Sequence, residues 1–132
     1  MLRVGVIAVA LIASAPLITQ ARADSASDVI ATWDPDHDGT LDLAEINKAA
    51  AADFDKLDVD HDGTLDMKEL GTRVTSAEFQ AADKDKDGTL DKAEYASIVA
   101  QRFHATNPDN DATIDAKELR TAAGARLMEL LK

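Results

Sequence analysis

Cysteine is absent from the 132-residue sequence, which excludes a disulfide framework and thiolate metal sites. Aromatic residues make up only 4% of the chain, so we expect a small core rich in alanine, leucine and isoleucine. Positive charge is also scarce, because 14 Lys and Arg residues stand against 25 Asp and Glu residues. The formal net charge of −11 argues against nucleic acid and anionic membrane surfaces as partners, since both need a basic patch.

The first 23 residues have the pattern of a secretory signal peptide. Arg3 gives a positive start, residues 4–19 are almost wholly apolar, and an A-x-A cleavage site ends at Ala23. The apolar run is short for a membrane span, and acidic sequence follows it at once. We therefore expect export, cleavage after Ala23, no membrane attachment afterwards, and a mature domain of residues 24–132. The mature chain keeps 12 basic and 25 acidic residues, because Arg3 and Arg22 are lost, and its net charge is −13.

Four twelve-residue segments of the mature chain repeat one acidic pattern. They begin 24 or 25 residues apart and read DPDHDGTLDLAE (34–45, loop 1), DVDHDGTLDMKE (58–69, loop 2), DKDKDGTLDKAE (83–94, loop 3) and NPDNDATIDAKE (107–118, loop 4). The first three match the EF-hand calcium-loop pattern D-x-D-x-D-G-x₅-E. A single match is compatible with a solvated acidic turn, but three full matches and a near match at even spacing argue against chance.

The spacing of the acids follows from the way such a loop curls around an ion. Oxygens at positions 1, 3 and 5 converge, position 6 turns sharply, position 7 offers a backbone carbonyl, position 9 contributes directly or through water, and position 12 is a bidentate glutamate. The predicted metal ligands are Asp34, Asp36, Asp38, Thr40, Asp42 and Glu45 in loop 1; Asp58, Asp60, Asp62, Thr64, Asp66 and Glu69 in loop 2; Asp83, Asp85, Asp87, Thr89, Asp91 and Glu94 in loop 3; and Asn107, Asp109, Asp111, Thr113, Asp115 and Glu118 in loop 4. Loop 4 has Ala112 in place of the turn glycine and Asn107 in place of the first aspartate, so we predict a weaker site there, or a loop that folds without metal.

Short connections predict that neighbouring loops share a helix. Residues 46–57 and 95–106 are helix-compatible, and each must both leave one loop and enter the next. Such a helix is about 20 Å long and holds its two loops at opposite ends. Between loops 2 and 3 the sequence breaks at residues 70–73, and Thr75 with Glu78 forms a capping-box pattern. We therefore expect an all-α fold, a compact helical bundle with four fused EF-hand loops sharing connecting helices, in which loop 2 lies beside loop 3 and loop 1 beside loop 4.

Helical periodicity predicts which apolar residues form the core. They are Ile30, Phe54, Phe79 and Phe103, four residues before each loop, and Leu41, Leu65, Leu90 and Ile114, at position 8 of each loop. His37 and His61 occupy position 4, where a solvated side chain is expected. Trp33 directly precedes loop 1 and, besides packing, can report on an ion bound there.

The donor set narrows the choice of ion. Every predicted ligand is a hard oxygen, which disfavours soft and imidazole-seeking metals. Mg²⁺ fits poorly because it needs a tight octahedron and keeps its waters, whereas Ca²⁺ fits the motif. Loops 1–3 each carry five carboxylates, however, which exceed the charge that a divalent ion can neutralise. A trivalent ion of similar size gains half as much attraction again against the same repulsion, although it is costlier to dehydrate.

In combination, these features resemble the lanmodulin family of periplasmic lanthanide-binding proteins. The shared features are four close-set loops, Asp at position 9 throughout, Pro35 and Pro108 at position 2, a signal peptide and the shared-helix spacing. The resemblance covers the mature chain and implies a three-helix-bundle-like fold, a periplasmic location, three strong lanthanide(III) sites with a weak fourth, large ordering on lanthanide binding and a far weaker response to calcium. Loops 2 and 3 depart from the family pattern, because Val59 and Lys84 replace its proline.

Two calcium functions remain as alternatives to periplasmic lanthanide handling. The loop motif alone equally supports a calcium buffer. A calcium sensor is less favoured, because the mature chain has only Met67 and Met128 whereas adaptable target grooves are Met-rich. No nucleophile–base pair, phosphate loop or open metal position is recognisable, so we expect metal ions as partners and no enzymatic activity.

Overall fold

A computed structural model describes residues 20–132 of the chain, with side chains from residue 25 onward. Residues 1–19 of the predicted signal peptide lie outside the described residues. The elements are α1 (Gln20–Trp33), β1 (Leu41–Asp42), α2 (Leu43–Leu57), α3 (Met67–Leu70), α4 (Ser76–Ala82), α5 (Lys92–Thr106), β2 (Thr113–Ile114), α6 (Ala116–Leu119) and α7 (Ala122–Met128). The predicted all-α class is confirmed, since the strands of this part of the chain form only one short pair.

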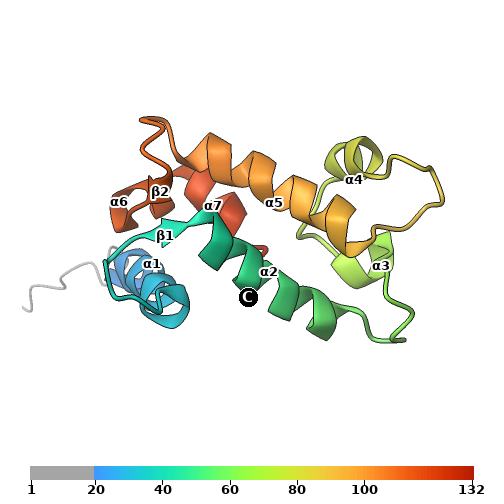
Figure 1. Cartoon of the computed structure of the whole chain (residues 1–132), viewed down its shortest axis with the longest axis horizontal. Coiled ribbons are helices and arrows are strands. Elements are labelled where there is room, and N and C mark those ends of the chain that lie inside the picture. The colour runs from blue at the N-terminus through green and yellow to red at the C-terminus, as the bar shows by residue number, and fades with distance from the viewer. Residues whose placement is uncertain (1–19) are drawn as a thin grey trace, which may run out of the picture.

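Two long helices, α2 and α5, cross the molecule and pack against each other (Figure 1). Helix α2 joins loop 1 to loop 2, and α5 joins loop 3 to loop 4, which confirms the predicted sharing of helices. Both helices have 15 residues and begin three residues earlier than the sequence predicted. The reason is that Asp42 and Asp91, at loop position 9, act as N-caps, so the last residues of each loop already lie in the helix.

Antiparallel pairing joins the loops in the predicted way. Strands β1 and β2 place Leu41 opposite Ile114, and an isolated bridge places Leu65 opposite Leu90. Loop 1 therefore lies beside loop 4, and loop 2 lies beside loop 3. The two pairs occupy opposite ends of the molecule (Figure 1).

The core lies between these two ends. All eight predicted core residues are buried: Ile30, Leu41, Phe54, Leu65, Phe79, Leu90, Phe103 and Ile114. The rings of Phe54 and Tyr95 meet edge to face between α2 and α5, with centroids 5.7 Å apart. Helix α7 packs on α5 and buries Leu127. Apolar contact along α2, α5 and α7 thus holds the two loop pairs on one scaffold.

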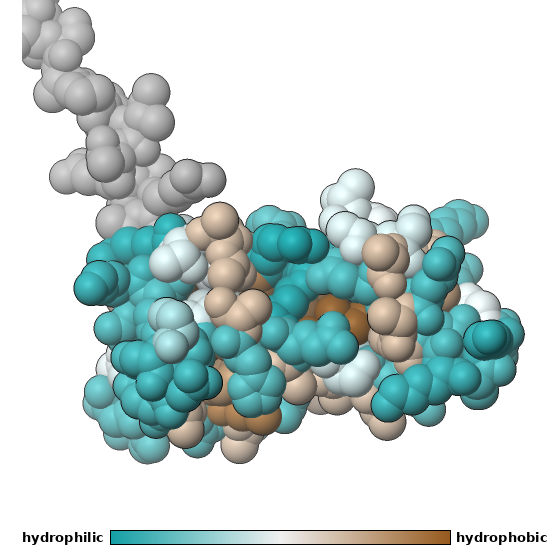
Figure 2. Space-filling model, turned by 90° about the horizontal axis from the view of Figure 1, so that it is seen from above, coloured by the Kyte–Doolittle hydropathy of each residue, from teal (hydrophilic) through white to brown (hydrophobic). Residues whose placement is uncertain are grey.

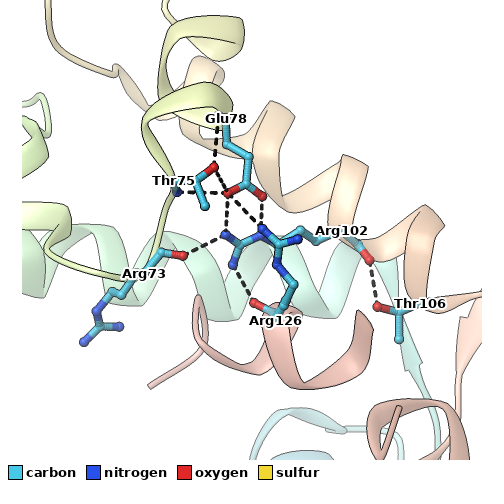
Figure 3. A network of polar contacts seen from close by, with 6 residues as sticks. All are labelled: Arg73, Thr75, Glu78, Arg102, Thr106 and Arg126. Carbon is cyan, nitrogen blue, oxygen red and sulfur yellow. Dashed lines mark hydrogen bonds and ion pairs between the residues drawn. The ribbon is translucent and has the colours of Figure 1, made fainter. Parts of the chain in front are cut away.

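A buried arginine fixes the break between α3 and α4 (Figure 3). Arg102 of α5 donates to the carbonyl oxygens of Arg73 at 2.7 Å and Arg126 at 2.5 Å. Its guanidinium also donates to both carboxylate oxygens of Glu78, at 3.0 and 3.1 Å. Glu78 completes the predicted capping box with Thr75, which is confirmed. One side chain therefore ties the turn, α4 and α7 to α5.

The face shown in Figure 2 is mainly hydrophilic, with small apolar areas between hydrophilic residues. Among the described residues, Val59 in loop 2 is the one large hydrophobic residue that is exposed, at 75%. Within residues 20–132, no helix combines the length and apolar character needed to cross a membrane.

Candidate metal centres

Three carboxylate clusters lie in loops 1–3, each built from positions 1, 3 and 12. They are Asp34, Asp36 and Glu45; Asp58, Asp60 and Glu69; and Asp83, Asp85 and Glu94. Within each cluster, one oxygen of each residue lies within 4.8 Å of the others. Ligands on opposite sides of a calcium-sized ion are about 5 Å apart, because each metal–oxygen bond is about 2.4 Å long. The spacing and the all-oxygen donor set therefore fit one such ion in each loop.

Hydrogen bonds inside each loop create this geometry. In loop 1, Asp34 accepts from the backbone N–H of Gly39 at 2.8 Å, and Asp38 accepts from the N–H and hydroxyl of Thr40 at 2.8 and 2.7 Å. Loops 2 and 3 repeat these bonds. The glycine at position 6 has φ between 84° and 87° in all three loops, a conformation that other residues adopt only with strain. The predicted sharp turn is therefore confirmed.

Position 4 of every loop also has positive φ, a feature that was not predicted from the sequence. The residues are His37, His61, Lys86 and Asn110, with φ between 55° and 61°. All four are exposed, in agreement with the solvated role expected for the two histidines. Asparagine is enriched in this conformation, so Asn110 carried a weak sequence signal for it, whereas lysine carries none.

Positions 9 and 12 form a capping box in each loop. In loop 1, Asp42 accepts from the backbone N–H of Glu45 at 2.8 Å, and Glu45 accepts from the backbone N–H of Asp42 at 2.9 Å. The other three loops repeat this box. It satisfies N–H groups at the helix start and turns the glutamate towards the loop. The D-x-x-E spacing is a signal for this second role, which was not predicted for these two positions.

The structure thus brings together fewer loop positions than the sequence predicted as metal ligands. Positions 1, 3 and 12 meet in the three clusters, while the aspartates at positions 5 and 9 lie in the same loops but outside the clusters. The aspartate at position 5 receives hydrogen bonds from position 7, and the one at position 9 caps the following helix. Their ligand roles stay predictions.

Desolvation, together with the charges of neighbouring carboxylates, raises the pKa of several loop carboxyls. For Glu45, burial is the main cause, and the charges of nearby aspartates add to it. The backbone N–H of Asp62 lowers the pKa of Asp60, but desolvation and the neighbouring carboxylates outweigh this and leave it raised. Asp85 in loop 3 follows the same pattern. The ionised loops therefore carry mutual repulsion that a bound cation would relieve.

Loop 4 differs from the other loops in its backbone and its donors. Ala112 has φ of 75°, so the cost expected from losing the turn glycine is present. Asn107 is 3% exposed, and its Oδ1 lacks a hydrogen-bond partner among the described residues. Oε1 of Glu118 is likewise buried and without such a partner there. Unsatisfied acceptors at positions 1 and 12 are expected in a loop that binds a cation. In loop 4 these acceptors stand on a strained backbone.

The site and the fold define a helical metal-binding protein with paired acidic loops. The EF-hand family model matches residues 51–74 and 77–99, which contain loops 2 and 3. These two matches support an EF-hand calcium-binding protein, a class of regulatory and buffering metal binders rather than enzymes. No curated protein matches the chain.

Proposed function

We propose that the chain is a lanthanide(III)-binding EF-hand protein of the lanmodulin type, which is exported to the periplasm and loses its signal peptide by cleavage after Ala23. Loops 1–3 are its strong sites, and loop 4 is a weak fourth. The observation that carries the proposal is the density of carboxylates. Each strong loop holds five, of which three bring oxygens within 4.8 Å of one another.

Charge favours a trivalent ion in such a loop. The repulsion among the carboxylates is set by the loop, whereas their attraction to the ion grows with the charge of the ion. Three trivalent ions add nine positive charges and take the mature chain from −13 to −4, whereas three calcium ions add six and leave −7. Desolvation is the larger cause of the raised pKa values of Glu45, Asp60 and Asp85, but neighbouring carboxylates add to them, and a more highly charged ion relieves that repulsion better.

The same repulsion links binding to folding. Without a cation, the clustered carboxylates oppose a fold whose core is small and poor in aromatic residues. Free energy gained on binding the ion then contributes directly to folding. We therefore expect the metal-free protein to be loosely packed at neutral pH and low salt, and the lanthanide-bound protein to be ordered.

A periplasmic calcium buffer is the second candidate function. The EF-hand matches and the all-oxygen clusters favour it, because both are typical of Ca²⁺ sites. A calcium sensor has less support, since Met67 and Met128 are partly buried against the core rather than lining an open groove.

Trp33 supplies the experiment that separates these functions. It is the last residue of α1 and directly precedes Asp34, so terbium in loop 1 should luminesce when the indole is excited. Trp33→Phe should abolish the signal without removing a ligand, and Asp34→Asn should weaken it by weakening the site. Millimolar calcium should leave micromolar terbium bound. Displacement of terbium at that concentration would make loop 1 a calcium site and overturn the lanthanide proposal.

A further inference from the structure

A groove lies between α4, α5 and α7. Its volume is about 370 Å³, which is towards the lower end of the range found for small-molecule sites. Its charged side chains are Glu78 from α4, Arg102 from α5 and Arg126 from α7, which meet at one point (Figure 3). Among the described residues that line it, none is a predicted metal ligand. The groove is therefore separate from the acidic loops and from their chemistry.

The apolar lining of the groove consists of alanines. Ala105 on α5 and Ala122 and Ala123 on α7 have side chains that end at Cβ, so the chain itself leaves the space between the two helices open. Ala105 and Ala122 are exposed. An aromatic ring or a short alkyl group placed here would take these methyl groups out of water, which favours binding.

Glu78 and Arg102 are already fully occupied by each other and by the fold. Oε1 of Glu78 accepts from Arg102 Nε at 3.0 Å, and Oε2 accepts from the N–H and hydroxyl of Thr75 at 2.9 and 2.8 Å. The remaining guanidinium nitrogens of Arg102 donate to Glu78 and to two backbone carbonyls. These two side chains hold the helices together, and neither has a group to offer a ligand.

Arg126 differs because most of its donors are uncommitted. Its Nη2 lies 3.3 Å from Oε2 of Glu78, and its side chain is 58% exposed. A guanidinium has five N–H donors arranged as a fork that matches both oxygens of a carboxylate. With two arginines against one glutamate, the groove has a net charge of +1 in a mature chain of −13. This charge favours an anion in the groove and disfavours a cation.

We propose that this groove is a second ligand site, which binds a small amphipathic carboxylate, an organic acid with one carboxylate and a short aromatic or alkyl group. The carboxylate pairs with Arg126, the amide of Gln101 on α5 offers a further hydrogen bond, and the apolar group covers the alanines. The acidic loops repel anions at long range, and three trivalent ions reduce the net charge from −13 to −4. The metal-loaded protein is therefore the form that binds the acid best.

A fluorinated aromatic acid and its neutral amide test the proposal. The acid is para-(trifluoromethyl)benzoate, and para-(trifluoromethyl)benzamide keeps the apolar part without the charge. Fluorine NMR gives the affinity of each for protein that holds one lanthanum ion, which is diamagnetic, in each strong loop. The acid should bind at least tenfold more tightly than the amide, the size expected from hydrogen bonds between charged groups. The backbone amide shifts of Gln101, Ala105 and Ala123 should move as the acid is added.

Substitutions in the groove test both halves of the site. Arg126→Gln should weaken binding of the acid about tenfold and leave binding of the amide unchanged. Arg120→Gln is the matched control, because it removes the same charge from an exposed residue outside the groove. Ala105→Leu should fill the groove and abolish binding of both compounds. Its matched control is Ala81→Leu, at an exposed position of α4 outside the groove, and this pair decides the question if Arg126→Gln does not fold.

Three results would overturn the proposal. They are equal affinities for the acid and the amide, equal effects of a groove variant and its control, and acid-induced shifts confined to the loop glycines Gly39, Gly63 and Gly88. The last result would show that the acid binds the lanthanum ions instead. The groove is independent of which ion fills the loops, so calcium-saturated protein should also bind the acid. A loss of lanthanide preference would therefore contradict the proposed function without affecting this site.

Discussion

Leu65 and Leu90 exchange two backbone hydrogen bonds, with Leu65 N donating to Leu90 O at 2.9 Å and Leu90 N donating to Leu65 O at 2.8 Å. Both residues are at position 8, directly between the turn and the helix of their loops. A change in the backbone of one loop is therefore transmitted to the other loop directly, through backbone hydrogen bonds rather than through flexible side chains. Loops 1 and 4 have an equivalent contact between Leu41 and Ile114.

This pairing predicts that damage to one site spreads within its own pair. Asp58→Asn should weaken lanthanum binding in loop 2 and also lower the affinity of loop 3 by about fivefold to tenfold, at the low end of the usual range of coupling between sites. Loop 1 should change less, because it is joined to loop 2 only through α2. Lanthanum titrations followed by the NMR shifts of the Gly39 amide in loop 1 and the Gly88 amide in loop 3 check this prediction. Equal weakening of loops 1 and 3 would show that coupling does not follow the strand contacts.

The Glu78–Arg102 contact predicts a pH-dependent contribution to stability. Burial alone would raise the pKa of Glu78, but hydrogen bonds from Arg102 and Thr75 lower it from 4.5 to about 2. The stabilisation is therefore present above pH 4.5 and is lost as the pH falls towards 2. Glu78→Gln should cost about 2 kcal/mol of unfolding free energy at pH 7, because Arg102 is buried and loses its charged partner.

Urea unfolding of the lanthanum-saturated protein measures this contribution. The difference between the native chain and Glu78→Gln should shrink as the pH is lowered below 4.5, while protonation of the loops affects both proteins alike. Glu129→Gln is the matched control, since its ion pair with Lys132 is exposed and should contribute less than about 0.5 kcal/mol. A constant difference across this pH range would rule out the role given to Glu78.

The carboxylate of Asp53 is buried, and its negative charge is only partly compensated by neighbouring positive charges. Desolvation raises the pKa of this carboxyl, and the charges of Arg73 and Lys56 offset the effect incompletely. Arg73 donates to its Oδ2 at 2.7 Å, while Oδ1 is buried without a partner among the described residues. A raised pKa means that folding favours the protonated carboxyl, so the stability attached to this group falls as the pH rises through its pKa.

Asp53→Asn should therefore change the unfolding free energy at pH 7 by less than about 1 kcal/mol, or increase it, because the amide keeps the shape and removes the charge. Arg73→Met should cost about 3 kcal/mol, since it leaves the buried carboxylate unpaired. The cost of Arg73→Met should decrease at lower pH as Asp53 takes up a proton. Equal costs for the two variants at pH 7 would contradict this account.

The features that could be predicted from the sequence are those set by spacing. Twelve residues per loop and a short connection between loops require shared helices, and these require the observed pairing of position 8 in loops 2 and 3. The Arg102 network could not be predicted, because its acceptors come from a turn, α4 and α7, each of them 24 or more residues from Arg102 in the sequence. Its geometry depends on tertiary packing, for which local patterns carry no signal.

The backbone conformation of the loops was predicted correctly at the position where positive φ favours one residue type, glycine. Glycine at position 6 signalled positive φ, and Ala112 signalled strain, and both are present. Position 4 was missed because Lys86 gives no warning of positive φ, and the enrichment of histidine and asparagine in that conformation is only a weak signal. The hydrogen bonds from Val59 N to Glu69 and from Lys84 N to Glu94 were also missed, because they depend on a backbone N–H rather than on a side chain.

Loop 4 provides a prediction about strengthening a site. Ala112→Gly removes the cost of a side chain at φ of 75°, and Asn107→Asp adds a carboxylate where a buried oxygen already lacks a partner among the described residues. Together they should raise the lanthanum affinity of loop 4 at least tenfold and give a fourth resolved site in calorimetry. Asn110→Asp is the matched control, because it adds the same charge at exposed position 4, outside the predicted ligand set. If this control strengthens loop 4 as much, net charge rather than ligand geometry limits the site. If the double variant leaves the stoichiometry and affinities unchanged, neither departure from the motif explains a weak loop 4.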